Sequence, residues 1–169
     1  MNKIYYTFDD LQKQVIRLAR KIIKSGYDPD FIVGITRGGL IPGTLLSHFL
    51  EKPMYTLDVS LRDTKEMGLE SNTWMAEMAY GHEDERKKIL IIDDINDSGA
   101  TINWIKKDWQ SGCFPDSEEW DARIWHGNVR FACLIDNINS DATIDYRAIE
   151  IAKTEEYNPW IVFPWEQDD

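Results

Sequence analysis

The chain has 169 residues, the size of one domain, and 43% of them are hydrophobic, which is enough to fill a core. Its formal net charge of −11 argues against a nucleic-acid partner, because proteins that bind nucleic acids usually present a basic face to the phosphates. No apolar run is long enough to span a bilayer, and two cysteines without metal-ligand spacing favour a reducing compartment. We therefore expect a cytoplasmic protein with no membrane partner.

An amphipathic helix is predicted over residues 8–24. Its apolar residues from Leu11 to Ile22 follow at spacings of four, three and four, which places them on one face. Thr7 is the expected N-cap, and Gly26 ends the helix. Similar patterns predict, in chain order, strands at 31–35, 53–61, 88–92, 129–135, 146–152 and 160–165, with further helices at 43–51 and 99–109.

Strands that alternate with helices predict an α/β fold, in which helices flank a central, mostly parallel sheet on both faces. We expect a single domain over residues 1–169, because no repeat or low-complexity segment divides the chain. Residues 62–86 are polar, rich in Met and without a clear period, so we expect a flexible lid there. Residues 109–127 form an irregular insertion whose role the pattern does not reveal.

Two adjacent acids, Asp93 and Asp94, follow the predicted strand that ends at Ile92. Ligands of open α/β sheets bind beyond the carboxyl ends of the strands, so this is a favourable place for a site. The two carboxylates repel each other, and a ligand that neutralises or bridges them relieves the repulsion. Together they can accept hydrogen bonds from the vicinal hydroxyls of a ribose, or hold a hard cation such as Mg²⁺.

A loop of small residues comes next, at the start of a predicted helix. Small residues let the backbone turn tightly with its N–H groups pointing inward, and the N-terminus of a helix carries partial positive charge. Such a loop can hold a phosphate monoester, so the whole stretch suits a ribose 5-phosphate. The loop residues are Asp97, Ser98, Gly99, Ala100 and Thr101.

The segment "LIIDDINDSGAT" resembles the signature of type I phosphoribosyltransferases, from which it departs at Asn96. The resemblance implies the fold of that family and the binding of phosphoribosyl pyrophosphate (PRPP) and Mg²⁺. A second segment, "GITRGGLIPGTLL", is similar to the loop that holds the pyrophosphate of PRPP in bacterial xanthine–guanine and hypoxanthine phosphoribosyltransferases. This implies contacts from Thr36, Arg37, Gly38 and Gly39, and family members often have a cis peptide between the residues that match the first two.

The C-terminal segment "NPWIVFPWE" is similar to the small hood of the same purine enzymes, which we expect over residues 136–166. The resemblance implies that Trp160 stacks on a purine base and that Ile161 lies at the edge of the base. Ile95, next to the paired acids, is a further expected contact of the base.

The purine enzymes usually have a lysine that reads the oxygen at purine C6, on or just after the strand before the hood. This chain has no lysine at that place. Arg130 at the start of the strand can donate a similar hydrogen bond, and Asp136 or Asn137 stands at its end. We expect Arg130 to contact the base.

The resemblance as a whole implies a purine phosphoribosyltransferase that converts PRPP and guanine, xanthine or hypoxanthine into a nucleoside 5′-monophosphate and pyrophosphate. Asp97 is then the candidate base near purine N7, and the only partners are small molecules and further copies of the chain in a homo-oligomer. Other readings stay open, namely a regulator that binds PRPP or a nucleotide without turnover, an enzyme for uracil, adenine or orotate, or a flavodoxin-like binding domain.

Overall fold

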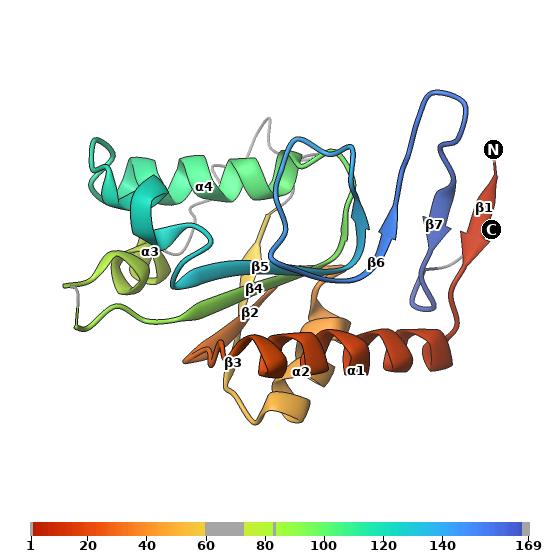
Figure 1. Cartoon of the computed structure of the whole chain (residues 1–169), viewed down its shortest axis with the longest axis horizontal. Coiled ribbons are helices and arrows are strands. Elements are labelled where there is room, and N and C mark those ends of the chain that lie inside the picture. The colour runs from red at the N-terminus through yellow and green to blue at the C-terminus, as the bar shows by residue number, and fades with distance from the viewer. Residues whose placement is uncertain (1, 60–72, 83, 167–169) are drawn as a thin grey trace.

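Helices pack on both faces of a central sheet in the computed structural model, which describes residues 2–59, 73–82 and 84–166 (Figure 1). The elements of this part are β1 (Lys3–Tyr5), α1 (Phe8–Ser25), β2 (Phe31–Thr36), α2 (Leu40–Leu50), β3 (Met54–Asp58), α3 (Thr73–Tyr80), β4 (Ile89–Asn96), α4 (Ala100–Gly112), the π-helix η1 (Trp120–Ile124), β5 (Val129–Asn137), β6 (Tyr146–Ile151) and β7 (Trp160–Val162). A five-stranded sheet has the order β3-β2-β4-β5-β6 with every pair parallel, which confirms the predicted α/β class.

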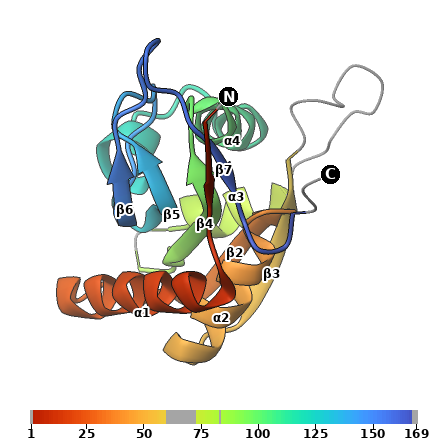
Figure 2. The ribbon, with the colours of Figure 1, turned by 90° about the vertical axis from the view of Figure 1, so that its right-hand side faces the viewer.

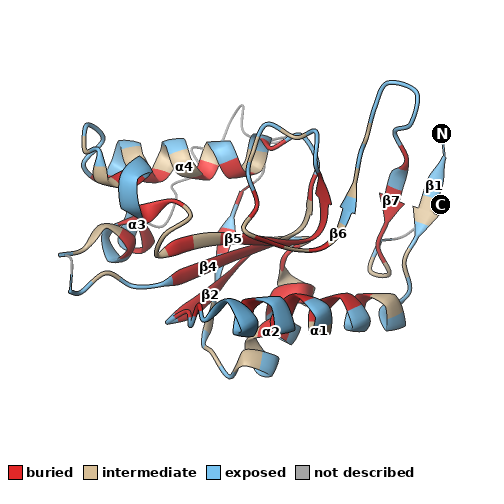
Figure 3. Ribbon diagram, in the orientation of Figure 1, coloured by how far each residue is buried: buried red, intermediate tan, exposed pale blue. Residues whose placement is uncertain are grey.

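The central strands are buried on both faces (Figure 3). Successive residues of a strand point to opposite faces, so the uninterrupted apolar runs of β2, β4 and β5 supply two cores at once. Helices α1 and α2 cover one face, and α3, α4 and η1 cover the other (Figure 1). Because all five strands are parallel, their carboxyl ends meet at the same edge of the sheet.

Helix α1 follows the prediction and is one residue longer. A capping box closes its start, since the Thr7 hydroxyl accepts the Asp10 N–H at 3.1 Å and the Asp10 carboxylate accepts the Thr7 N–H at 2.9 Å. Gly26 ends the helix with a φ of 77°, in the left-handed region. Helix α2 begins at Leu40, earlier than predicted, because a proline such as Pro42 is tolerated in a first helical turn.

The predicted insertion at 109–127 is part of the core. Trp120 and Ile124 of η1 are buried, and the Trp120 ring stacks on Trp125 at 5.0 Å between centroids. Trp125 also lies 5.9 Å from both Trp109 and Phe131, so the insertion covers the sheet with a continuous aromatic layer. We call these four aromatic residues of the layer, Trp109, Trp120, Trp125 and Phe131, the aromatic face.

The predicted lid at 62–86 contains an ordered helix that the sequence pattern did not reveal. Helix α3 buries Met75, Ala76 and Ala79 against the same core as the aromatic face. Arg86 at the end of the range pairs with Glu119 of the insertion at 2.8 Å. Residues 60–72 and 83 lie outside the described residues, so the lid itself stays a prediction.

The N-terminal strand β1 pairs in parallel with β7 of the C-terminal segment, which brings the two ends of the chain together (Figure 2). Ile4 is opposite Ile161 in this register. The range predicted for the hood, 136–166, also includes β6, which belongs to the main sheet. In the described part of the chain, no helix has the length and apolar character needed to cross a membrane.

Candidate active site

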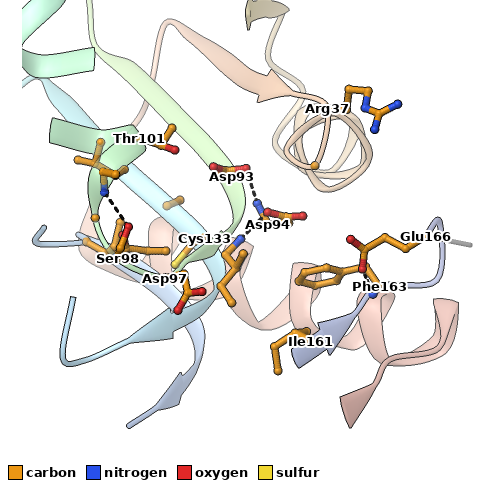
Figure 4. Close-up of a pocket in the computed structure, with 18 of the residues that line it drawn as sticks. Arg37, Asp93, Asp94, Asp97, Ser98, Thr101, Cys133, Ile161, Phe163 and Glu166 are labelled. Atoms are coloured by element: carbon orange, nitrogen blue, oxygen red, sulfur yellow. Dashed lines mark hydrogen bonds between the residues drawn. The ribbon is translucent and has the colours of Figure 1, made fainter. Parts of the chain in front are cut away.

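A cavity of about 990 Å³ opens at the carboxyl edge of the sheet. Its wall includes residues from the end of β4, the loop before α4, the start of α2 and the C-terminal segment, together with residues of β5, Ile144 and Lys153 (Figure 4). The structure therefore brings most of the predicted site residues to one cavity. Those that line it are Arg37, Gly38, Asp93, Asp94, Ile95, Asp97, Ser98, Gly99, Ala100, Thr101, Trp160 and Ile161.

The paired acids lie inside the last part of β4, which runs on to Asn96 rather than ending at Ile92. The Asp93 carboxylate accepts the Asp94 N–H at 2.9 Å, and the Asp94 carboxylate accepts the Ile95 N–H at 2.7 Å. Burial raises the pKa of Asp93 well above its usual range, and repulsion from Asp94 raises it further. Burial also raises the pKa of Asp94, to about 6. The site is therefore built to receive positive charge or hydrogen-bond donors.

The loop at 97–101 turns sharply into α4. Gly99 is the N-cap, with a φ of 88°, and a Cβ at this residue would lie 2.6 Å from the Ala142 nitrogen. Only glycine satisfies both the backbone conformation and the close approach. The Ser98 hydroxyl accepts the Ala100 N–H at 3.3 Å, and no side chain caps the helix. The N–H groups of Thr101 and Ile102, in the first turn of α4, thus remain available for an anion at the cavity wall.

The loop between β2 and α2 contributes less than the resemblance implied. The Thr36–Arg37 peptide is cis, as expected, and Arg37 and Gly38 line the cavity. A Cβ at Gly38 would lie 2.2 Å from an Asp94 carboxylate oxygen, which explains the glycine. Thr36 and Gly39 do not line the cavity. The Thr36 hydroxyl donates to Asp58 at 2.8 Å, and Gly39 packs so closely on β4 that a Cβ there would meet a backbone oxygen.

An apolar wall stands opposite the acids. Trp160 is 44% exposed, and Ile161 is buried behind it. Two further aromatic residues of the wall, Phe163 and Trp165, stack on each other with 4.8 Å between centroids. The sequence analysis quoted both within the C-terminal segment without assigning them a role. A planar, apolar ligand fits between this wall and the end of β4.

Comparisons with known proteins agree with this geometry. The model of the phosphoribosyl transferase domain matches residues 3–168. The chain belongs to the phosphoribosyltransferase family. It is 25% identical to the hypoxanthine-guanine phosphoribosyltransferase of Schizosaccharomyces pombe over 99% of this chain and 90% of that protein, and 26% identical to the xanthine-guanine phosphoribosyltransferase of Cereibacter sphaeroides over 96% and 86%. The crystal structure of a purine phosphoribosyltransferase from Pyrococcus horikoshii superimposes with a TM-score of 0.68 at 27% identity, covering 100% of this chain and 97% of that one.

Arg130, which the sequence analysis expected to contact the base, does not line the cavity. Arg130 is the second residue of β5, at the amino edge of the sheet, opposite the edge where the cavity opens. Its guanidinium donates to the Tyr146 hydroxyl at 2.6 Å and to the Gly127 carbonyl at 2.9 Å, and it lies 4.4 Å from the centroid of the Tyr27 ring. These contacts hold the amino end of β5 in place, and they keep the Arg130 side chain away from a ligand in the cavity.

The departure from the family signature at Asn96 has a structural reason. The buried Asn96 amide donates to Asp136 at 2.8 Å and to the Ser140 hydroxyl at 2.7 Å. Asp136 in turn accepts Arg147 at 2.6 Å. Asn96 therefore connects the end of β4 to the turn after β5. Both carboxylate oxygens of Asp136 accept hydrogen bonds within this network, so Asp136 is not available to contact a purine base.

Lys153 is a cavity residue that the sequence analysis missed. It follows β6 and belongs to no motif, but its ammonium lies 3.0 Å from the Asp97 carboxylate. A lysine just beyond the carboxyl end of a strand was the available signal, because every such end in a parallel sheet reaches the same edge.

The residues present fit a bound Mg²⁺ only together with the substrate. Among the described residues, no three His, Cys, Asp or Glu side chains lie close enough to form a complete metal site. Mg²⁺ commonly binds through one or two carboxylates plus substrate phosphates and water. Asp93 and Asp94 can supply those carboxylates, and a cation would offset the cost of burying their charges, which raises both pKa values.

Proposed function

We propose that this protein transfers the 5-phosphoribosyl group of PRPP to a 6-oxopurine, such as guanine, xanthine or hypoxanthine, in purine salvage. The products are a nucleoside 5′-monophosphate and pyrophosphate. One observation carries the proposal: the paired acids, the 97–101 loop, Arg37 and the apolar wall all line the same cavity. The named relatives with xanthine-guanine and hypoxanthine-guanine activity support the choice of base class.

The sugar phosphate occupies the middle of the cavity in this proposal. The N–H groups of the 97–101 loop and the hydroxyls of Ser98 and Thr101 bind the 5-phosphate at the start of α4. Asp93 and Asp94 then accept hydrogen bonds from the two ribose hydroxyls. Their carboxylates also favour the positive charge that develops at C1 when the bond to pyrophosphate breaks.

The leaving pyrophosphate lies on the side of Arg37. Figure 4 places this guanidinium beyond Asp94 from the loop of Asp97, so the two ends of PRPP are separated by the acids. Arg37 donates to the pyrophosphate oxygens. When bound, Mg²⁺ neutralises charge on the pyrophosphate and so makes it a better leaving group.

The purine enters between the apolar wall and Asp97. Trp160 stacks on the ring, with Ile95 and Ile161 beside it. As the ring nitrogen attacks C1, the purine must lose a proton, and the Asp97 carboxylate is the acceptor at N7. A lid from the segment at 62–86 would exclude water from the positively charged ribosyl group, which water would otherwise attack.

A base-panel assay tests the proposal. The protein is incubated with PRPP, Mg²⁺ and one base at a time, and pyrophosphate release is followed. Turnover with at least one 6-oxopurine is expected, with adenine, uracil and orotate much poorer. PRPP binding without turnover of any base would instead favour the regulator. Size-exclusion chromatography and cell fractionation would test the homo-oligomeric state and the cytoplasmic location that belong to the same proposal.

A further inference from the structure

Residues 138–145, which we call the crossover, join β5 to β6 and lie beside the first turn of α4 (Figure 1). Parallel strands are usually connected by a longer segment that contains a helix, whereas this connection has none. The crossover lies so close to the 97–101 loop that a Cβ at Gly99 would meet the Ala142 nitrogen at 2.6 Å. It therefore supports, from outside the cavity, the loop that binds the 5-phosphate in the proposed function.

Two carbonyl groups of that loop accept hydrogen bonds on the side away from the cavity. The Asp141 N–H donates to the Ser98 carbonyl at 3.0 Å, and the Asn137 amide donates to the Asp97 carbonyl at 2.9 Å. Neither Asp141 nor Asn137 lines the cavity. In a planar trans peptide the N–H points opposite to the C=O, so these two bonds turn the N–H groups of Ser98 and Gly99 towards the cavity.

Asn96 fixes the crossover to the end of β4. The side chain is buried, and its amide donates to the Ser140 hydroxyl at 2.7 Å, which donates in turn to the Ala142 carbonyl at 2.9 Å. The same amide donates to Asp136 at 2.8 Å, and Asp136 is held by Arg147 of β6. An amide nitrogen has two N–H donors, and both are used here. Asn96 therefore acts on the crossover and has no donor left for a ligand.

We propose that Asn96 is a positioning residue for the 5-phosphate, because it holds the crossover in the place from which Asp141 orients the 97–101 loop. This inference rests on the proposed function. Without the amide, the crossover is free to shift, and the Ser98 carbonyl loses its fixed donor. The N–H groups of Ser98 and Gly99 then lose their common direction. Donors that are already oriented bind a phosphate more tightly, because less freedom is lost when the ligand arrives.

The effect should be confined to one end of PRPP. Arg37, which binds the pyrophosphate in the proposed function, belongs to the loop before α2 and lies beyond Asp94 from the loop of Asp97 (Figure 4). Ribose 5-phosphate carries the 5-phosphate without the pyrophosphate, so its affinity reports on the 97–101 loop. Inorganic pyrophosphate with Mg²⁺ reports on the other end.

The test compares Asn96→Leu with the wild type by calorimetry. We expect the Kd of ribose 5-phosphate to rise by about 10- to 30-fold, as for hydrogen bonds to a charged group, and the Kd of pyrophosphate with Mg²⁺ to change less than about twofold. In steady-state kinetics, KM for PRPP should rise similarly, while kcat should fall less than about threefold. An equal loss for both ligands, or no loss for either, would overturn the inference.

Ser140→Ala removes the hydroxyl through which the Asn96 amide holds the crossover. It should also weaken the binding of ribose 5-phosphate. The double variant should bind about as weakly as Asn96→Leu alone, because two residues that act along one path are not additive. A double variant whose loss is the product of the two single losses would contradict the inference.

Asn128 provides a matched control at the amino edge of the sheet, just before β5. Its amide also makes two hydrogen bonds, to the carbonyls of Ala79 at 2.9 Å and Lys87 at 2.8 Å. Asn128→Leu should lower the melting temperature but keep both ligand affinities within about twofold of the wild type. If it weakens ribose 5-phosphate as much as Asn96→Leu does, the effect is a general loss of stability and the inference fails.

The base-panel assay separates this inference from the proposed function. If the wild type binds ribose 5-phosphate and turns over no base, the proposed function fails, whereas a selective loss in Asn96→Leu still supports the positioning role. If the wild type turns over a 6-oxopurine and Asn96→Leu shows no selective loss, only the present inference fails. A wild type that does not bind ribose 5-phosphate contradicts both.

Discussion

The carboxyl edge of the sheet and the aromatic face bury side chains with opposite effects on stability. At the edge, Asp93 and Asp94 lie next to each other with raised pKa values, so ionising them in the folded state costs free energy. On the aromatic face, Trp109 and Trp120 are fully buried, and their rings pack against Trp125. Such rings bury large apolar areas and stabilise the fold.

Stability and function therefore reside in different regions of this chain. The edge carries the recognisable motifs and is held together by the rest of the molecule. The aromatic face carries no motif, yet its burial offsets the cost of the acids. Substitutions at the edge should therefore change binding and turnover, whereas substitutions on the aromatic face should change the free energy of unfolding.

Asp97→Asn should lower kcat by about 10²- to 10⁴-fold, because an amide cannot take the proton from the purine. The same change should leave PRPP affinity and the melting temperature almost unchanged, since the Asp97 side chain is 53% exposed and an amide has the same shape. Steady-state kinetics and calorimetry with PRPP measure both effects. Equal losses of kcat and PRPP affinity would mean that Asp97 has a structural role instead.

Trp120→Ala should lower the free energy of unfolding by about 3–5 kcal/mol, because it removes a fully buried ring and leaves a cavity. Phe114→Ala, in the same insertion but with the ring 63% exposed, is the matched control and should cost less than about 1 kcal/mol. Chemical denaturation of both variants makes the comparison. Similar losses would show that the insertion is not the anchored core layer described above.

Asp94→Asn should raise the free energy of unfolding at pH 7 by about 1–3 kcal/mol, while weakening the binding of PRPP with Mg²⁺. The pKa of Asp94 is about 6 in the folded protein, above its ordinary value of 3.8, so the folded state holds the proton more tightly than the unfolded state does. The stability of the wild type should therefore increase as the pH falls from 7 towards 4, and this increase should be smaller in the variant.

Asp84→Asn is the control for that experiment, because Asp84 is exposed and does not line the cavity. It should leave the pH profile unchanged. If the Asp94→Asn variant is less stable than the wild type at pH 7, this would contradict the view that the buried acid lowers the stability of the fold while it serves ligand binding.

Much of this architecture could be predicted from the sequence because local and global signals agreed. The apolar runs at 31–35 and 88–92 have the length of buried strands, and the glycines and acids after them mark the ends where a site forms. The spacing of residues 8–24 predicted α1 together with its N-cap Thr7. In each case the residues that set the structure are neighbours in the chain.

The parts that could not be predicted depend on contacts between distant segments. Strand β1 is three residues long and exists because it pairs with β7 at the other end of the chain. The π-helix η1 does not follow the period of an α-helix, so its buried Trp120 gave no periodic signal. The positions of Arg130 and Lys153 relative to the cavity could not be predicted for the same reason, since only the direction of the strands reveals which end of each one reaches the cavity.

The central claim is that one corner of the sheet holds a phosphorylated ribose. A crystal structure of the protein with guanosine 5′-monophosphate tests it most directly. We predict that the phosphate bonds to the backbone N–H groups of residues 97–101 and that the ribose hydroxyls bond to Asp93 and Asp94. A nucleotide whose ribose phosphate lies anywhere else on the protein would contradict the account.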